Sequence, residues 1–83
     1  MRLPRNLSGQ RLIYLLKIFG YQVTRQTGSH IRLTTLEMGE HHMTIPQHNA
    51  LRVGTLSVIL TDVAQHFQMS KEEVIEQLFK DEP

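Results

Sequence analysis

The strongest constraint on the fold of this chain is a regular alternation of apolar and polar residues near its middle. Ile31 and Leu33 stand two positions apart after Gly28, so the residues between them lie on the opposite face of an extended strand. Gly28 tolerates a positive φ at no steric cost, which favours a tight turn before this strand. The pattern therefore predicts a β-hairpin with one apolar face and one polar face.

Three short strands are predicted from this region of the chain. They cover residues 21–26, 30–36 and 41–45, which alternate or are rich in strand-forming types, and the first turn is predicted at residues 27–28. Pro46 lacks a backbone N–H donor and is expected to end the third strand. Because the connections are short, the strands are predicted to form an antiparallel meander.

Helical periodicity of the apolar residues is found on both sides of the strands. Residues 8–19 carry an apolar stripe behind Ser8, which is a good N-cap, and the stripe ends at Gly20. Thr55 is predicted to cap a second helix, whose apolar residues recur at helical spacing as far as Phe67.

The C-terminal residues predict one more helix, over about 70–80. A capping box, in which Ser70 is followed three residues later by Glu73, opens it. The order α-β-β-β-α-α belongs to the α+β class, with the helices on one face of a three-stranded antiparallel sheet. A chain of 83 residues is expected to form one domain, over residues 1–83, with the other sheet face open to solvent or to a ligand.

Composition excludes several classes of protein. The chain has no cysteine, so a disulfide framework and a thiolate metal site are both unavailable. No apolar run approaches the ~20 residues that span a bilayer, and the N-terminal residues lack the apolar core of a secretion signal. A cytoplasmic protein without a membrane partner is therefore expected.

The charges are distributed unevenly although the net charge is only +1. Six of the eight acidic residues lie from Asp62 onward, whereas seven of the nine basic residues precede it. This asymmetry favours a polyanionic ligand on the basic part of the chain. Ordinary surface charge is the alternative explanation.

His30 is the first candidate for chemistry, because the alternation places it with Arg32 on the polar face of the hairpin. A histidine titrates near neutral pH and can act as a general acid or base. Gly28 and Ser29 offer backbone N–H groups and a hydroxyl to a phosphate oxygen, and Arg25 is expected to flank the same anion. The alternative is a surface histidine that merely begins the second strand after the turn.

Two further positions are candidates on weaker grounds. His48 could be the second member of an acid–base pair, since phosphodiester cleavage removes one proton and supplies another, or it could be a polar loop residue. Gly54 and Thr55 open the predicted second helix, whose free N–H groups, with Arg52 nearby, could bind a phosphate. A plain helix cap explains those residues equally well.

A dedicated metal site is not predicted. His41 and His42 are adjacent on a strand, so they point to opposite faces, and no familiar zinc spacing links them to Glu40 or His48. His66 lies near the C-terminal end of the second predicted helix, which indicates a structural role.

Several motifs occur together, in order, between about residues 8 and 64. They follow a short amphipathic helix and read Phe19-Gly20-Tyr21, Arg25-Gln26-x-Gly28-Ser29-His30, Thr44-Ile45-Pro46-x-His48, Gly54-Thr55-Leu56 and Ile59-Leu60. As a set they resemble the HicA toxin family, also called YcfA-like. Its members are the small mRNA interferases of bacterial type II toxin–antitoxin pairs.

The resemblance implies a double-stranded-RNA-binding-domain-like fold and RNA cleavage that needs neither a metal nor another cofactor. It also implies that His30 is the essential residue, that mRNA is the substrate, and that a HicB-type antitoxin covers the active site. Gln47 departs from the family, which usually has a basic residue there. The acidic segment 70–83 extends beyond the shortest members and is either an additional packing helix or a dimerisation element.

The sequence therefore favours a metal-independent endoribonuclease toxin with His30 as the catalytic residue and His48 as a candidate partner. The residues expected to bind RNA phosphates are Arg25, Gly28, Ser29, Arg32, Arg52, Gly54 and Thr55. A non-catalytic RNA- or protein-binding module on the same fold is the first alternative. A metal-dependent nuclease built on the histidines is the second.

Overall fold

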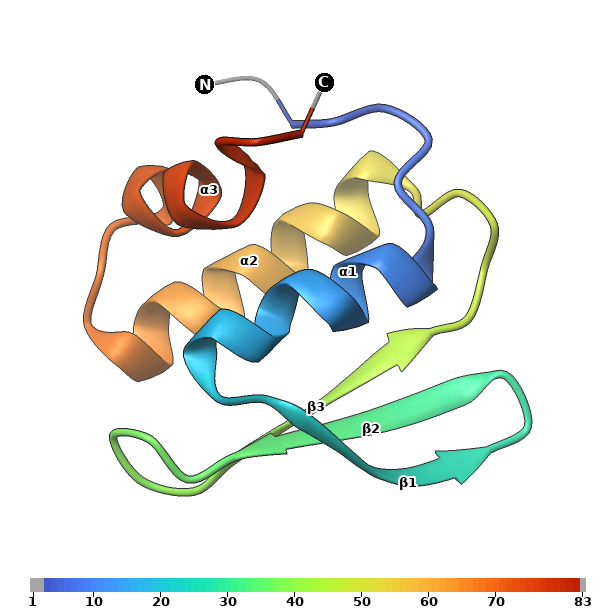
Figure 1. Cartoon of the computed structure of the whole chain (residues 1–83), viewed down its shortest axis with the longest axis horizontal. Coiled ribbons are helices and arrows are strands. Elements are labelled where there is room, and N and C mark those ends of the chain that lie inside the picture. The colour runs from blue at the N-terminus through green and yellow to red at the C-terminus, as the bar shows by residue number, and fades with distance from the viewer. Residues whose placement is uncertain (1–2, 83) are drawn as a thin grey trace.

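The computed structural model describes residues 3–82 and has a helical layer packed on one face of a small sheet (Figure 1). Met1, Arg2 and Pro83, which belong to the predicted domain, lie outside the described residues. The element order confirms the predicted α+β class: α1 (Gly9–Leu15), its 3₁₀ continuation η1 (Leu16–Phe19), β1 (Gln22–Thr27), β2 (His30–Thr35), β3 (His41–Pro46), α2 (Val53–Phe67) and α3 (Lys71–Phe79).

The first helix begins and ends where the sequence predicted. The Ser8 hydroxyl accepts a hydrogen bond from the Arg11 backbone N–H at 3.0 Å, which satisfies one of the free donors at the helix start. The last turn narrows to a 3₁₀ helix and stops at Gly20, whose φ of 84° is the left-handed conformation that ends helices.

The three strands form an antiparallel sheet in the order β1-β2-β3. The first turn lies one residue later than predicted, because Thr27 still pairs with His30 and only Gly28 and Ser29 form the loop. Gly28 has a φ of 58°, and a two-residue hairpin loop favours such a left-handed first residue. Tyr21 precedes β1 and is buried instead of being the first strand residue.

The two faces of the sheet separate as the alternation predicted. Ile31 and Leu33 of β2, with Met43 and Ile45 of β3, are buried beneath the helices. The residues that alternate with these, starting with His30 on β2, point to the other face of the sheet and are mostly exposed. We call this uncovered side the open face.

The second helix begins earlier than predicted. Its N-cap is Arg52, not Thr55, and no side chain caps it. Leu56 N–H bonds to the Arg52 carbonyl at 2.9 Å, so Thr55 already lies within the first turn. The predicted capping role of Thr55 is therefore wrong, because the backbone enters the helix three residues before the first buried side chain, Leu56.

The third helix has the predicted capping box, with both the Ser70 and Glu73 hydrogen bonds formed. Its buried side chains belong to the hydrophobic core cluster of the described residues. They are Val74, Ile75, Leu78 and Phe79. The helix therefore packs on the fold, and dimerisation through it stays a prediction.

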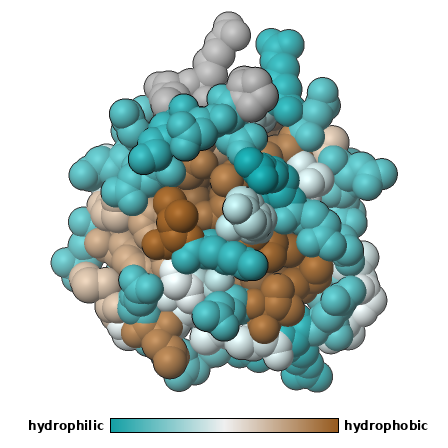
Figure 2. Space-filling view, viewed as in Figure 1, coloured by the Kyte–Doolittle hydropathy of each residue, from teal (hydrophilic) through white to brown (hydrophobic). Residues whose placement is uncertain are grey.

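On the face shown in Figure 2, hydrophilic residues predominate around the edge, and most of the hydrophobic residues that reach the surface lie nearer the middle. None of the helices described here has both the length and the apolar character needed to cross a membrane.

Candidate functional site

The residues of the candidate site lie on the open face where β1 and β2 form their hairpin. Arg25 on β1 and Arg32 on β2 are direct cross-strand partners, and His30 lies two residues before Arg32. All three side chains are exposed. Since alternate residues of a strand share a face, His30 and Arg32 point to the same side of the sheet.

A β-bulge brings Arg25 to this side. Gln22 and Val23 pair with Thr34 and Leu33, but the register shifts after Val23, so that Arg25 faces Arg32. Without the extra residue, Arg25 would pair with a core-facing position of β2 and point towards the helices.

A shallow depression of about 250 Å³ connects these side chains, lined by Arg25, Thr27, His30, Arg32 and Thr44. None of the described residues that line it is acidic. Two guanidinium groups and an imidazole beside an open surface are suited to holding a phosphate, since arginine can donate two parallel hydrogen bonds to its oxygens.

The imidazole of His30 is available to a ligand. Among residues 3–82, its ring has no hydrogen-bond partner, and the side chain is exposed. Both ring nitrogens can therefore exchange a proton with a bound molecule, which a histidine held by structural partners could not do freely.

His48 does not line this depression. It is exposed in the loop after β3, two residues beyond Pro46, which pairs with His30. The Gln47 N–H donates to the Ser29 carbonyl at 2.6 Å, so the loop is attached to the hairpin turn. The structure therefore places His48 in the loop beside the hairpin but outside the cluster formed by His30 and the two arginines.

The predicted phosphate-binding residues fall into two groups. Gly28 and Ser29 form the turn that precedes His30 and so adjoin the two arginines. Arg52, Gly54 and Thr55 lie at the start of α2, in a different part of the fold, and none of them lines the depression.

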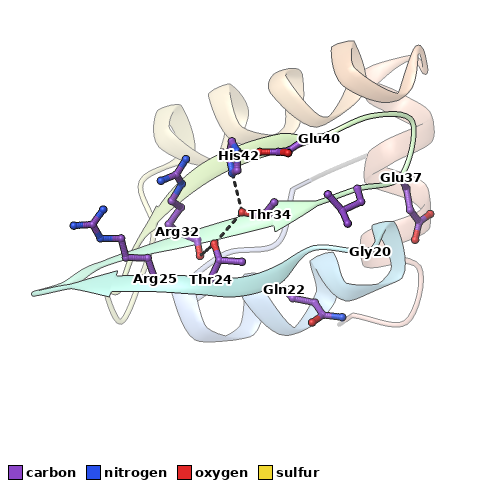
Figure 3. A pocket seen from close by; sticks show the side chains of 10 residues that line it. Gly20, Gln22, Thr24, Arg25, Arg32, Thr34, Glu37, Glu40 and His42 are labelled. Atoms are coloured by element: carbon purple, nitrogen blue, oxygen red, sulfur yellow. Dashed lines mark hydrogen bonds and ion pairs between the residues drawn. The ribbon is translucent and has the colours of Figure 1, made fainter.

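Sequence reasoning missed a second, larger depression on the open face (Figure 3). It has a volume of about 770 Å³ and adjoins the first depression, with which it shares two arginines. The residues that line it are Gly20, Gln22, Thr24, Arg25, Arg32, Thr34, Leu36, Glu37, Glu40 and His42. The outward position of His42 was predictable from alternation, but its neighbours depend on strand register.

A chain of hydrogen bonds crosses this depression from β1 to the residue before β3. The Thr24 and Thr34 hydroxyls are 2.8 Å apart, and Thr34 Oγ1 lies 2.8 Å from His42 Nδ1. His42 Nε2 then lies 2.6 Å from Glu40 Oε2 (Figure 3 draws the two threonine contacts). The chain fixes the orientation of the Glu40 and His42 side chains.

The other histidines have structural partners between the sheet and α2. Tyr21 Oη lies 2.7 Å from His41 Nδ1, and His41 Nε2 lies 3.3 Å from Asp62 Oδ1. His66 stacks on His41 with ring centroids 4.5 Å apart, and its Nε2 donates to the Glu37 carbonyl at 2.9 Å. Among the described residues, no group of three histidine or carboxylate side chains is arranged to hold a metal ion.

Tyr21 makes the stability of the folded protein sensitive to alkaline pH. Burial, and to a smaller extent the charge of Asp62, raise the pKa of the Tyr21 hydroxyl above its ordinary value. An unfolded tyrosine loses its proton near pH 10, so above that pH the unfolded state binds fewer protons than the folded state. The free energy of unfolding should then fall by up to about 1.4 kcal/mol per pH unit for this group.

Urea denaturation at pH 8 to 11 tests this prediction. Tyr21→Phe should flatten the alkaline fall, although it also removes the hydrogen bond to His41. Tyr14→Phe, which changes an exposed tyrosine, is the matched control and should keep the fall. Identical pH profiles for the wild-type protein and Tyr21→Phe would contradict the assignment.

Comparison with protein families identifies the family of the chain. The family model of the HicA toxin of bacterial toxin–antitoxin systems matches residues 9–64, from the start of α1 into α2. Comparisons with curated proteins and with solved structures gave no match. The matched segment is most of the chain and contains His30 with both arginines of the first depression. The chain therefore belongs to the HicA toxin family of bacterial toxin–antitoxin systems.

Proposed function

We propose that the protein is a metal-independent endoribonuclease, an mRNA interferase toxin in which His30 is the catalytic residue. The observation that carries the proposal is the exposed imidazole of His30 beside the paired guanidinium groups of Arg25 and Arg32. Family membership gives the chain a toxin role and an antitoxin partner, and RNA cleavage is the chemistry that this cluster best supports.

The reaction uses the ribose 2′-hydroxyl of the RNA as its nucleophile. The 2′-oxygen attacks the adjacent phosphorus, the bond to the 5′-oxygen of the next nucleotide breaks, and a cyclic phosphate is left. His30 removes the proton from the 2′-hydroxyl or supplies one to the leaving oxygen, and such assistance is typically worth about 10²–10⁴-fold in rate. Arg25 and Arg32 hold the phosphate and offset the charge that develops on its oxygens.

Several other residues complete the proposal. The backbone N–H groups around Gly28 and Ser29 adjoin the bound phosphate. His48 supplies the second proton transfer from the loop after β3, which is attached to the hairpin turn that precedes His30. Arg52 and the start of α2, at Gly54 and Thr55, contact phosphates farther along the strand.

The proposed partner is a HicB-type antitoxin that covers the open face. The helices leave this face of the sheet uncovered, and both depressions lie on it. A protein seated there would exclude RNA from His30 without any change in the fold.

The nucleophile decides between this mechanism and a metal-dependent one. An RNA oligonucleotide should be cleaved in the presence of EDTA, and the product should carry a 2′,3′-cyclic phosphate, because the 2′-oxygen forms that bond. The same sequence made of DNA should stay intact. Cleavage of DNA and RNA at similar rates, or loss of activity in EDTA, would overturn the proposed chemistry.

A further inference from the structure

We propose that the larger depression on the open face is a base-recognition pocket, in which Glu40, oriented by His42, selects RNA bases that carry an exocyclic amino group. The inference rests on the proposed RNA cleavage. It adds the residues that choose a nucleotide next to the cleaved phosphate.

The position of the pocket follows from the lining residues that it shares with the smaller depression. Arg25 and Arg32 line both depressions, so a phosphate held by them beside His30 lies at the mouth of the larger one. Thr34 is two residues beyond Arg32 on β2, about 7 Å along the strand. That span is comparable with the reach of a base from its own phosphate, and the volume of about 770 Å³ lies in the range of small-ligand sites.

The charge of the pocket changes from one end to the other. Arg25 and Arg32 lie at one end and Glu37 lies at the opposite end, while Glu40 lies between them beside His42 (Figure 3). A ligand that is anionic throughout would be repelled by the carboxylates. A nucleotide satisfies both ends, because its phosphate is anionic and its base is neutral with N–H donors.

The hydrogen-bond chain gives the Glu40 carboxylate its selectivity. Glu40 Oε2 is engaged by His42 Nε2 at 2.6 Å, and His42 is held in turn by Thr34 at 2.8 Å. Among residues 3–82, the second oxygen of Glu40, Oε1, has no hydrogen bond or ion pair. This oxygen can accept a hydrogen bond but cannot donate one, so it favours an amino group over a carbonyl on the facing base.

The facing edge of each base determines the expected preference. Cytosine, adenine and guanine present an amino group to an acceptor, whereas uracil presents a carbonyl oxygen at the position equivalent to the cytosine amino group. Leu36, which is exposed and lines the same depression, offers the base an apolar surface.

Cleavage of matched oligonucleotides tests the pocket. Each substrate is a DNA strand with one ribonucleotide, so only one phosphate can be cleaved, and the base on either side of it is varied in pairs. The pairs are cytosine against uracil, guanine against hypoxanthine, and adenine against purine, which differ at the amino group. The wild-type protein should favour the amino member of at least one pair by about tenfold or more.

Glu40→Gln should abolish this preference, because an amide both donates and accepts and can pair with either member. Glu76→Gln removes the same charge from an exposed position of α3, in the helical layer, and should keep the preference. Equal cleavage within every pair by the wild-type protein would overturn the pocket. A preference that survives Glu40→Gln would overturn it as well.

Binding separates failure of the pocket from failure of the proposed function. If the wild-type protein cleaves none of the oligonucleotides, the nuclease proposal has failed, and the pocket is decided by fluorescence anisotropy of labelled oligocytidylate, oligoadenylate, oligoguanylate and oligouridylate. His30→Ala should bind at least one amino-bearing strand about tenfold more tightly than oligouridylate. Adding Glu40→Gln should remove the difference, and equal affinities for all four strands with His30→Ala would overturn the pocket.

Discussion

Replacing His30 by alanine is expected to lower the rate of RNA cleavage by about 10²–10⁴-fold, the usual worth of a general acid–base group. The exposed ring of His30 has no hydrogen-bond partner among residues 3–82, so the substitution should leave the fold intact. Single-turnover cleavage of a labelled RNA measures the rate, and growth after induced expression measures toxicity. The wild-type protein should arrest growth, whereas the variant should not.

The controls separate the competing explanations. Gln65→Ala changes an exposed residue of α2 and should cleave like the wild-type protein. If His30→Ala is as active as the wild type, His30 is not the catalyst. If neither protein cleaves RNA or arrests growth, a non-catalytic binding module explains the open face instead. His48→Ala tests the second proton transfer, since a pair that acts together should lose activity in similar measure.

Gly9→Ala is expected to destabilise the protein strongly although it adds only one methyl group. A Cβ at Gly9 would overlap the Pro46 carbonyl oxygen and lie 3.3 Å from the Gln47 Cα, both in the backbone. The Gly9 N–H also donates to the His48 carbonyl at 2.9 Å, so α1 lies directly against the end of β3. Crowding of this kind typically costs about 1–3 kcal/mol in the free energy of unfolding.

Gly54→Ala is the matched control for this prediction. A Cβ there would meet nothing within 4 Å, and Gly54 lies in the first turn of α2. Alanine favours a helix over glycine by roughly 0.5–1 kcal/mol, so this variant should be as stable as the wild-type protein or slightly more so. Urea denaturation of both variants gives the comparison, and equal stabilities would show that the start of α1 is not tightly packed.

The periodicity of the sequence was sufficient to predict the elements and the faces. Ile31 and Leu33 alternate with polar residues, and the structure buries them while His30 stays exposed. The capping box at Ser70 predicted the start of α3 for a similarly local reason, because both of its hydrogen bonds connect residues three apart. Strand and cap geometry depend on neighbours in the chain, and the sequence contains that information directly.

Local patterns were insufficient where packing decides an element boundary. Thr55 is a favourable cap residue, yet α2 begins at Val53 with Arg52 as an N-cap that makes no side-chain hydrogen bond. The hairpin turn lies one residue later than predicted because Thr27 still pairs with His30. In both places the backbone follows the neighbouring elements, and these override a modest local preference.

The sequence by itself determined the α+β order, the buried and open faces of β2 and β3, and the choice of His30 as the residue to test. Only the tertiary structure decided which side chains surround it. The bulge after Val23 sets Arg25 opposite Arg32, and the pairing of β2 with β3 sets Thr34 opposite His42. The period of a strand is a local property, but the register between strands depends on turns, bulges and packing across the fold, and a shift of one residue reverses every face.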